Sequence, residues 1–221
     1  MATRYALIVE DTVTSTQDVA YGAFAGRPVV VVAEHQVGGR GRNGRRWEQP
    51  DRGLFVSVAF GPDWEHQEWP KLALAAGLAA RDVFPAVDLK WPNDLLLSGK
   101  KAGGVLSEAK APVVTIGLGV NLSWANPPEF AIAMMDADPG RDETLAWALE
   151  WVESLLDKVE QGPDAWGLDE YRSACATLGM MVSWAPGLTG RAIEVDETGR
   201  LVVETPYEVI ALASGEVHLV P

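Results

Sequence analysis

The residues best suited to chemistry are concentrated between Ala33 and Trp47. This segment follows a hydrophobic run and reads A-E-H-Q-V-G-G-R-G-R-N-G-R-R-W, with four arginines and four glycines in the ten residues from Gly38. Glycine lets a backbone approach a ligand closely, and arginine offers planar cationic forks for phosphate or carboxylate oxygens. The segment therefore predicts a loop that closes over an anion and stays mobile until that anion arrives.

Two other interpretations of this loop are open on composition alone. Most charge runs are solvated turns, and segments rich in glycine and arginine also bind nucleic acid. The whole chain has a formal net charge of -13, which argues against broad binding to nucleic acid or to an anionic membrane. A local cluster of positive charge in an otherwise acidic chain favours the binding of a discrete small anion.

The composition indicates a protein of the cytoplasm. A chain of 221 residues with 48% hydrophobic content can form the core of one large domain and a small one. Cys175 is the only cysteine, so no intramolecular disulfide can form, and we expect it to fill core space within a helix. No segment has the length and apolarity of a membrane span, and residues 1–10 carry no signal-peptide pattern.

Hydrophobic periodicity predicts the elements that position the loop. Alternating or β-branched runs predict strands at 5–9, 28–32, 53–60, 87–91, 95–97, 104–108 and 112–119. Apolar residues at helical spacing predict helices at 17–24, after the capping residues 11–16, and at 70–84, before Pro85. A third helix is expected from an Asp142 cap to Gly162, and a fourth from Pro163 to just before Gly179. Lys101 falls in a predicted turn at 99–101.

The hydrophobic pattern of the chain changes at Met180. Short alternating segments recur at 182–184, 192–195, 201–204 and 209–212, and Glu197-Thr198-Gly199-Arg200 has the composition of a hairpin turn. These segments predict a small all-β barrel of about five strands. We therefore divide the chain into residues 1–178 and 179–221. Because no helix precedes Tyr5, we expect no N-terminal DNA-binding domain and no repressor function.

Polar clusters stand at strand ends or turns throughout the larger domain. Taken singly, each has a plain structural explanation: Ser15 as a helix cap, Asn93 and Asp94 as turn formers, Lys101 as a surface lysine. Their joint occurrence in one chain is harder to explain structurally. The clusters are Ser15-Thr16-Gln17, Gln36 with the arginine loop, Lys90-Trp91-Pro92-Asn93-Asp94, Lys101 with Gly103-Gly104, and Gly117-Leu118-Gly119-Val120-Asn121.

These motifs resemble the biotin protein ligases. The matching segments are T-S-T-Q at 14–17, E-H-Q-x-x-G-R-G-R-x-G-R-x-W at 34–47, K-W-P-N-D at 90–94, K-A-G-G-V-L-x-E at 101–108 and G-L-G-V-N at 117–121. G-R-A-I-x-V-D at 190–196 extends the resemblance over almost the whole chain. It implies an α+β fold: a catalytic domain of class II synthetase type, with a central mixed sheet flanked by helices, and a C-terminal SH3-like barrel.

The resemblance also implies a reaction in two steps. Biotin and ATP would form biotinyl-5′-adenylate, and a lysine of a biotin carboxyl carrier protein would then receive the biotin. The implied cofactors are ATP and Mg²⁺, without a protein metal site, since His35, His66 and His218 are scattered. Neither nucleic acid nor membrane is an expected partner, and the sequence leaves monomer and homodimer open.

Residue roles follow from the resemblance position by position. Lys101 and Arg42 would be catalytic. The biotin-binding set would be Ser15, Thr16, Gln36, the Arg40 backbone, Lys101 and Gly104. The nucleotide- and phosphate-binding set would be Arg42, Arg45, Trp47, Asn93, Asp94 and Asn121, where Asp94 is either an orienting group or only a turn cap. Ser123 departs from the family pattern, in which a second asparagine is common there, and this concerns adenine or loop contacts.

Other functions compete with this prediction. A lipoate protein ligase would share fold and chemistry, but the intact G-R-G-R-x-G-R-x-W loop favours biotin. A nucleic-acid-binding module using the arginine loop is disfavoured by the net acidity. A ligand sensor without catalysis is disfavoured by the presence of Lys101.

Overall fold

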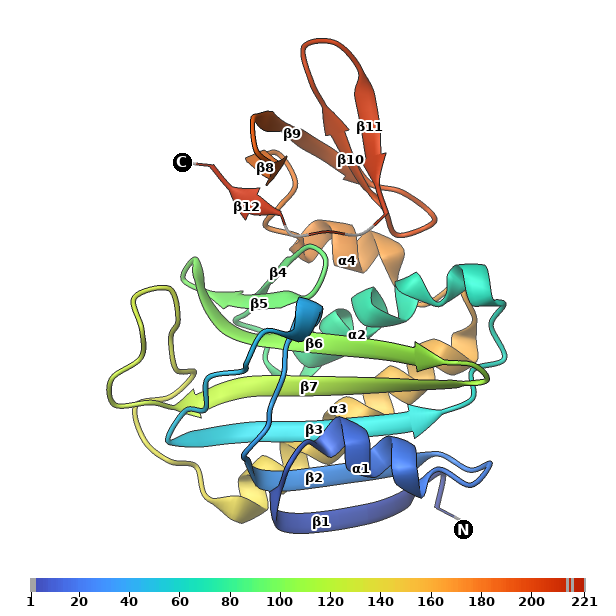
Figure 1. Ribbon diagram of the computed structural model, residues 1–221, viewed down its shortest axis with the longest axis vertical. Coiled ribbons are helices and arrows are strands. Elements are labelled where there is room, and N and C mark those ends of the chain that lie inside the picture. The colour runs from blue at the N-terminus through green and yellow to red at the C-terminus, as the bar shows by residue number, and fades with distance from the viewer. Residues whose placement is uncertain (1–2, 214, 216, 221) are drawn as a thin grey trace.

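Seven strands form a mixed β-sheet in the order β1-β2-β3-β7-β6-β5-β4 (Figure 1). The computed structural model describes residues 3–213, 215 and 217–220. β1 pairs with β2 in parallel, and the other neighbours are antiparallel. The strands are β1 Ala6–Val13, β2 Val29–Gln36, β3 Arg52–Phe60, β4 Asp88–Lys90, β5 Asp94–Leu97, β6 Lys100–Lys110 and β7 Val113–Ser123.

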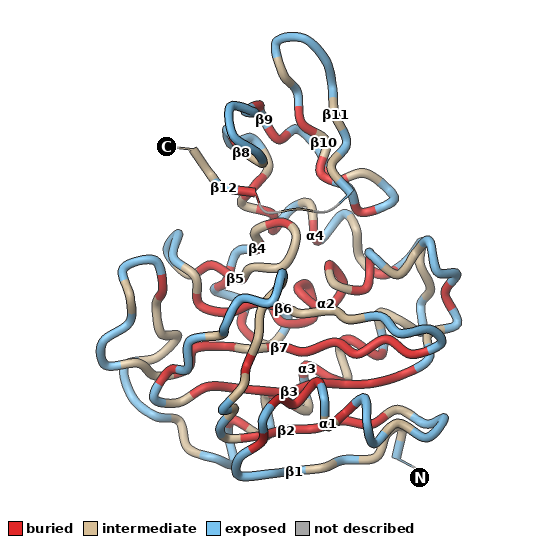
Figure 2. Tube along the Cα trace, viewed as in Figure 1, coloured by how far each residue is buried: buried red, intermediate tan, exposed pale blue. Residues whose placement is uncertain are grey.

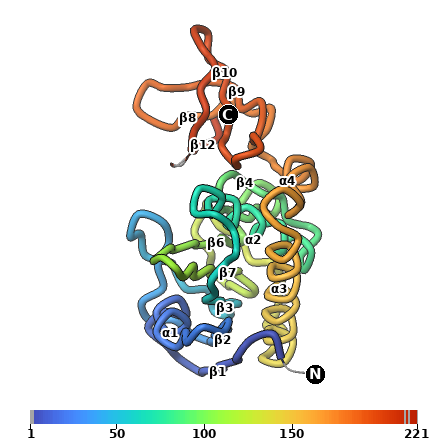
Figure 3. Tube along the Cα trace, turned by 90° about the vertical axis from the view of Figure 1, so that its right-hand side faces the viewer, coloured from blue at the N-terminus to red at the C-terminus, as the bar shows by residue number. Residues whose placement is uncertain are grey.

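Helices cover both faces of this sheet. α1 (Thr16–Ala23) lies on one face, and α2 (Pro70–Val83) and α3 (Arg141–Gln161) lie on the other, as the turned view shows (Figure 3). α4 (Leu168–Ala174) packs against α2 and β4. Two short 3-10 helices, Arg42–Gly44 and His66–Glu68, lie in the connecting loops.

The alternation of side chains along the strands explains this arrangement. In β2, Val30 and Val32 join the large core under α2 and α3, whereas Val29 and Val31 join a smaller cluster with Ala20 of α1. Successive side chains of a strand point to opposite faces, so a strand with apolar residues at every position must be covered twice. Figure 2 accordingly shows β2, β3 and β7 buried along most of their length.

The ends of the helices follow from glycine and proline. α2 begins at Pro70, which favours the first helical position, and ends just before Phe84-Pro85, as predicted. α3 ends at Gln161, just before Gly162 as predicted, but it begins at Arg141 after Gly140, so the Asp142 cap was wrong. Asp142 and Glu143 lie in the first turn instead, where the helix dipole favours carboxylates.

Three further expectations of local structure were wrong. Cys175 is buried as expected, but it follows the end of α4 and does not lie within a helix. The helix expected from Pro163 begins only at Leu168, because residues 163–167 form turns that end at Gly167 with a φ of 108°. Lys101 lies in β6 and not in a turn. The turn that precedes it consists of Ser98 and Gly99, both with positive φ, which is the two-residue hairpin geometry that matches strand twist.

A second sheet of five antiparallel strands follows, in the order β11-β10-β9-β8-β12. It lies beyond β4 and β5 (Figure 1), and its buried Val195, Leu201 and Val203 continue the large core. Trp91 joins the two sheets, since its Nε1 donates to the Gly199 carbonyl at 3.0 Å. The strands are β8 Met181–Ala185, β9 Leu188–Val195, β10 Leu201–Glu204, β11 Val209–Leu212 and β12 His218–Leu219. Within the described ranges, none of the helices is long and apolar enough to cross a membrane.

Candidate active site

A cavity of about 430 Å³ opens on the face of the large sheet that α1 partly covers. The cavity is large enough for a small organic ligand. Its walls come from α1, from strands β3, β6 and β7, from the loop between β2 and β3, from residues 124–131 and from Val217. Every residue that was assigned a site role from the sequence lines it: Ser15, Thr16, Gln36, Arg40, Arg42, Arg45, Trp47, Asn93, Asp94, Lys101, Gly104 and Asn121.

Strand alternation brings the motif residues to this face. In G-L-G-V-N, the side chains of Leu118 and Val120 enter the core, so Gly117, Gly119 and Asn121 face the cavity. Two of these glycines leave little room for a side chain. A Cβ at Gly117 would lie 2.9 Å from Ser57 Oγ, and one at Gly119 would lie 3.0 Å from the Trp47 indole.

One end of the cavity is a network of neutral polar groups. Gln36 Oε1 accepts hydrogen bonds from Thr16 N at 2.8 Å and from Thr16 Oγ1 at 3.1 Å. Thr16 Oγ1 also lies 2.7 Å from Ser57 Oγ. With its oxygen used twice, the Gln36 amide is oriented so that its NH2 group serves as a donor. Ser15 takes the N-cap position of α1 but makes no side-chain cap hydrogen bond.

The arginine loop forms a hairpin over the cavity. Its base is held by hydrogen bonds from Val37 N to Val13 O at 3.0 Å and from Gly38 N to Thr14 O at 2.8 Å. Its two arms pair through Trp47 N to Gly39 O at 2.9 Å and through Gly41 N to Arg45 O at 2.7 Å. The loop thus lies over the cavity, and both its closure over an anion and its mobility without one stay predictions.

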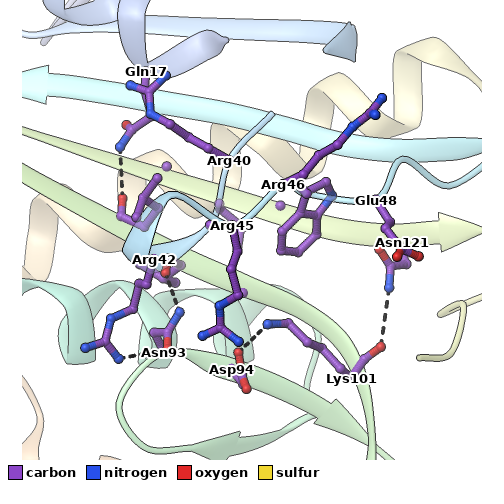
Figure 4. Close-up of a pocket in the computed structure, with 18 of the residues that line it drawn as sticks. Gln17, Arg40, Arg42, Arg45, Arg46, Glu48, Asn93, Asp94, Lys101 and Asn121 are labelled. Carbon is purple, nitrogen blue, oxygen red and sulfur yellow. Dashed lines mark hydrogen bonds and ion pairs between the residues drawn. The ribbon is translucent and has the colours of Figure 1, made fainter. Parts of the chain in front are cut away.

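The four arginines of the loop have different surroundings (Figure 4). Arg40 turns back to Asp18 and Glu108. Arg42 donates to the Gly215 carbonyl at 3.0 Å and to Asn93 Oδ1 at 3.4 Å. In Figure 4, Arg45 extends towards the end of the cavity that holds Asp94 and Lys101, whereas Arg46 points away from it. Arg42 and Arg45 are therefore the loop cations best placed to meet an anion.

Lys101 lies at the centre of a charged cluster. Asp94 receives Lys101 Nζ at 2.5 Å and Lys90 Nζ at 3.0 Å on its two oxygens. Burial raises the pKa of Asp94, but the positive charges of Lys101 and Lys90 lower it more, so the net pKa lies below its ordinary value. Asp94 is thus a carboxylate at neutral pH, and it holds Lys101 in the cavity. Lys101 Nζ also lies 5.6 Å from the centre of the Trp47 ring.

The far end of the cavity holds a donor and an acceptor without partners. Trp47 Nε1 and Asn121 Oδ1 are buried and have no hydrogen-bond partner among the described residues. The Asn121 amide is oriented by its Nδ2, which donates to the carbonyls of Lys101 and Ile132, each at 3.3 Å. Buried polar groups are seldom left unpaired, so this pair suggests a polar ligand.

Sequence reasoning missed several residues of the cavity. Ser57 is buried in β3 and contacts Thr16, and its signal was a lone hydroxyl in an otherwise apolar strand. Lys90 was noted in its motif without a role, although it pairs with Asp94. Phe130 and Val217 carry no local signal, because a loop and the second sheet bring them to the cavity.

The chemistry of this arrangement is the control of negative charge. The cavity combines a cluster of cations with neutral hydrogen-bonding groups, and its described lining includes no histidine or cysteine. Such a site is suited to stabilising charge that develops on a substrate.

Comparison with known proteins agrees with this chemistry. Residues 12–121 match the model of the biotin/lipoate A/B protein ligase family. The biotin--[acetyl-CoA-carboxylase] ligase of Mycobacterium tuberculosis is 34% identical to the chain over 236 residues, which cover 96% of this chain and 88% of that protein. The chain belongs to the biotin protein ligases. The bifunctional ligase/repressor BirA of Bacillus spizizenii is 37% identical, over 96% of this chain and 74% of that protein.

Solved structures of biotin protein ligases share the fold. The biotin protein ligase of Aquifex aeolicus in complex with biotin and ATP superposes with a TM-score of 0.78 and 28% identity, over 97% of this chain and 98% of that chain. The predicted family, the α+β fold with a mixed sheet and a second small sheet, and the class of ATP-dependent ligase are thereby confirmed.

Proposed function

We propose that this biotin protein ligase activates biotin with ATP and transfers it to a lysine of a biotin carboxyl carrier protein. The observation that carries the proposal is the position of Lys101 in the cavity. Its ammonium group lies between a neutral hydrogen-bonding end and an end with unpaired polar groups beside an indole. A molecule that is joined to a nucleotide through a charged phosphate needs a neutral polar site for itself, a cation beside the phosphate and a further polar site for the nucleotide.

The neutral end is suited to the ureido ring of biotin. This ring has a carbonyl oxygen and two N–H groups, so it needs both donors and acceptors. We infer that Gln36 supplies its NH2 group, and that the hydroxyls of Ser15 and Thr16 and the backbone of Arg40 complete the set. Because Gln36 and Thr16 already orient each other, the site is arranged before the ligand binds.

Adenylate formation would take place beside Lys101. A carboxylate oxygen of biotin attacks the α-phosphorus of ATP, and pyrophosphate leaves with its electron pair. Lys101, Arg42 and Arg45 would stabilise the charge that spreads over the phosphate oxygens. Gly104 supports this geometry, since a Cβ there would lie 3.6 Å from Lys101 Nζ and 3.3 Å from the Asn93 carbonyl. One such fixed donor contributes about 10²- to 10³-fold in rate.

The other end is suited to adenosine. We infer that the Trp47 indole packs on the adenylate and that Asn121 Oδ1 accepts from the adenine amino group, which would give this oxygen a partner. Asn93 acts on the phosphate indirectly, through Arg42. Its Nδ2 donates to the Val105 carbonyl at 2.9 Å, and its Oδ1 accepts from Arg42, so it braces a phosphate-binding arginine.

Transfer would follow in the same cavity. The amine of a carrier lysine attacks the carbonyl carbon of the mixed anhydride, an amide forms, and AMP leaves. Asp94 is a weak base because both its oxygens hold ammonium groups and its pKa is lowered. We therefore assign Asp94 to orienting Lys101 and the incoming amine by hydrogen bonding and charge.

Mg²⁺ would be held mainly by the nucleotide. It binds oxygen ligands, keeps several waters and often uses one or two carboxylates together with substrate phosphates. In the described chain, no three His, Cys, Asp or Glu side chains converge. Asp94 is taken by lysines, and Glu48 is the other carboxylate at the cavity. We propose that Mg²⁺ enters with the triphosphate, where it would neutralise phosphate charge.

We propose residues 1–178 as the catalytic domain and residues 179–221 as a domain that closes one side of the cavity. Val217 lines the cavity and the Gly215 carbonyl accepts from Arg42, which supports this division of roles. A homodimer stays a prediction. We expect no nucleic-acid partner, because the arginine loop folds onto the chain's own carboxylates and cavity.

The test is the intact mass of a carrier domain incubated with this protein, biotin and Mg-ATP. We expect a gain of one biotinyl group, and no gain when the acceptor lysine of the carrier is replaced by arginine. A parallel incubation offers lipoate together with biotin. Lipoyl transfer without biotinyl transfer would reassign the enzyme, and binding to single-stranded oligonucleotides without biotin-dependent ATP–pyrophosphate exchange would favour a nucleic-acid-binding module.

A further inference from the structure

Arg40 is held by two carboxylates from separate elements. Its Nη1 and Nη2 donate to the two Asp18 oxygens at 2.8 and 2.6 Å, a bidentate pair with α1. Its Nη2 and Nε also donate to Glu108 of β6 at 3.0 and 3.4 Å. Nearly every donor of this guanidinium is thus used inside the protein, and its side chain is not available to a phosphate.

A further contact fixes the carboxylate that Arg40 shares. Gln17 Nε2 donates to Glu108 Oε2 at 3.2 Å and to the Leu106 carbonyl at 3.2 Å. Glu108 therefore receives hydrogen bonds from α1 and from the loop at once. We call Asp18, Arg40 and Glu108 the loop clamp. It joins α1, the arginine loop and β6 at one point, although its members lie 22 and 68 residues apart in the chain.

The position of the clamp decides what it can do. The last backbone hydrogen bond between the loop and the rest of the large domain, on the β2 side, is that of Gly38 to Thr14. Arg40 stands two residues further on, at the start of the hairpin, where it pairs with Arg46. A restraint at this point sets the direction in which the hairpin leaves the sheet, and hence where Arg42, Arg45 and Trp47 lie over the cavity.

We propose that Asp18 and Glu108 are positioning residues that act through Arg40 to hold the arginine loop closed over the bound adenylate. This role rests on the proposed function, and neither carboxylate lines the cavity. The clamp governs mainly how long the intermediate stays bound, because Lys101, the cation proposed beside the reacting phosphate, belongs to β6 and not to the hairpin that the clamp positions.

The clamp contributes little to folding. The side chains of Arg40, Asp18 and Glu108 are 29%, 56% and 38% exposed, and ion pairs at such sites stabilise a protein weakly. The hydrogen bonds from Arg40 hold the pKa of Asp18 below its ordinary value, so the pair is ionised throughout the neutral range. A positioning role and a structural role can therefore be separated by experiment.

The test is the double variant Asp18→Asn/Glu108→Gln, which keeps side-chain shape and removes both charges. We expect the melting temperature to match that of the unchanged protein, and the rate of biotin-dependent pyrophosphate release in the first turnover to change less than adenylate escape does. We expect biotinyl-adenylate to escape about five-fold faster, as the weakening of two exposed charge-assisted contacts would allow. Escape is measured as free adenylate and as biotinylation of a bystander protein. The single variant Asp18→Glu keeps the negative charge and should therefore keep most of the retention of biotinyl-adenylate.

The matched control is Asp11→Asn. Asp11 pairs with Arg141 at 2.9 Å in a more exposed ion pair away from the cavity, so this variant should retain adenylate normally. Normal retention in the double variant, or equal leakage in the control, would overturn the clamp. Absence of biotin-dependent pyrophosphate release in the unchanged protein would instead overturn the proposed function. If the double variant does not fold, Asp18→Asn alone carries the same test.

Discussion

The two faces of the seven-stranded sheet differ in what covers them. Under α2 and α3 most of the buried side chains are apolar, and Trp151, Leu72 and Leu155 are fully enclosed. The face under α1 has a small apolar cluster around Ala20 and Val31, and beside it the cavity. Buried polar groups gather there, among them Thr16, Gln17, Ser57 and Asn121.

This difference teaches that the same strands supply stability on one side and chemistry on the other. Apolar burial on the helix-covered face contributes most of the favourable free energy of folding. The other face can then hold polar side chains in fixed positions for a ligand. Substitutions on the two faces should therefore have separable effects, one on the free energy of unfolding and the other on the reaction.

The largest expected effect is on the helix-covered face, from Trp151→Ala. The change removes a fully buried indole and its hydrogen bond from Nε1 to the Ala76 carbonyl at 3.0 Å. We expect the free energy of unfolding to fall by about 3–5 kcal/mol. Chemical denaturation measures this loss, while adenylate formation per folded molecule should be unchanged. The exposed neighbour Glu150→Ala is the control, and a specific loss of catalysis in Trp151→Ala would contradict the separation of the faces.

The next effect is on the cavity face, from Lys101→Ala. We expect biotin-dependent ATP–pyrophosphate exchange to fall about 10²- to 10³-fold, because a fixed charge beside the reacting phosphate is lost. The melting temperature should change little, since Asp94 keeps Lys90 as a partner. The exposed neighbour Lys100→Ala should exchange normally. Equal losses in the two lysine variants would show that position in the cavity is not what matters.

The smallest effect concerns the loop that covers the cavity, from Arg42→Gly. This arginine holds Gly215 and Asn93 and is placed to shield the adenylate. We expect the intermediate to escape about ten-fold faster, since hydrogen bonds of charged groups contribute about 1.5–3 kcal/mol. Bystander biotinylation measures the escape. If the variant retains biotinyl-adenylate as well as the unchanged protein does, Arg42 does not shield it, and other residues of the loop retain it.

Much of the fold could be predicted because its signals are local. The alternation of Leu54, Val56, Val58 and Phe60 predicted β3, and all four enter the core. Proline and glycine marked the ends of α2 and the end of α3. The start of α4 could not be found in the same way. Pro163 is compatible with a helix start, but the left-handed Gly167 decides where the helix begins.

The candidate site was predicted through motifs, and what lay outside them was missed. Each predicted residue lines the cavity, but its role is a proposal. The turn before Lys101 was misplaced because Ser98 adopts a positive φ that serine rarely takes. Glu108 ends the motif at 101–108 but was given no role, and Asp18 gave no signal, since their partner Arg40 is remote in sequence.

The contact between Gly119 and Trp47 ties two distant segments into one steric unit. A Cβ at Gly119 in β7 would lie 3.0 Å from the indole, so the Trp47 ring packs directly against the backbone of that strand. Positions 47 and 119 should therefore vary jointly among descendants of this sequence, a bulkier strand residue being tolerated only beside a smaller ring. Positions 47 and 119 are therefore the first to change in a variant designed to bind a larger nucleotide.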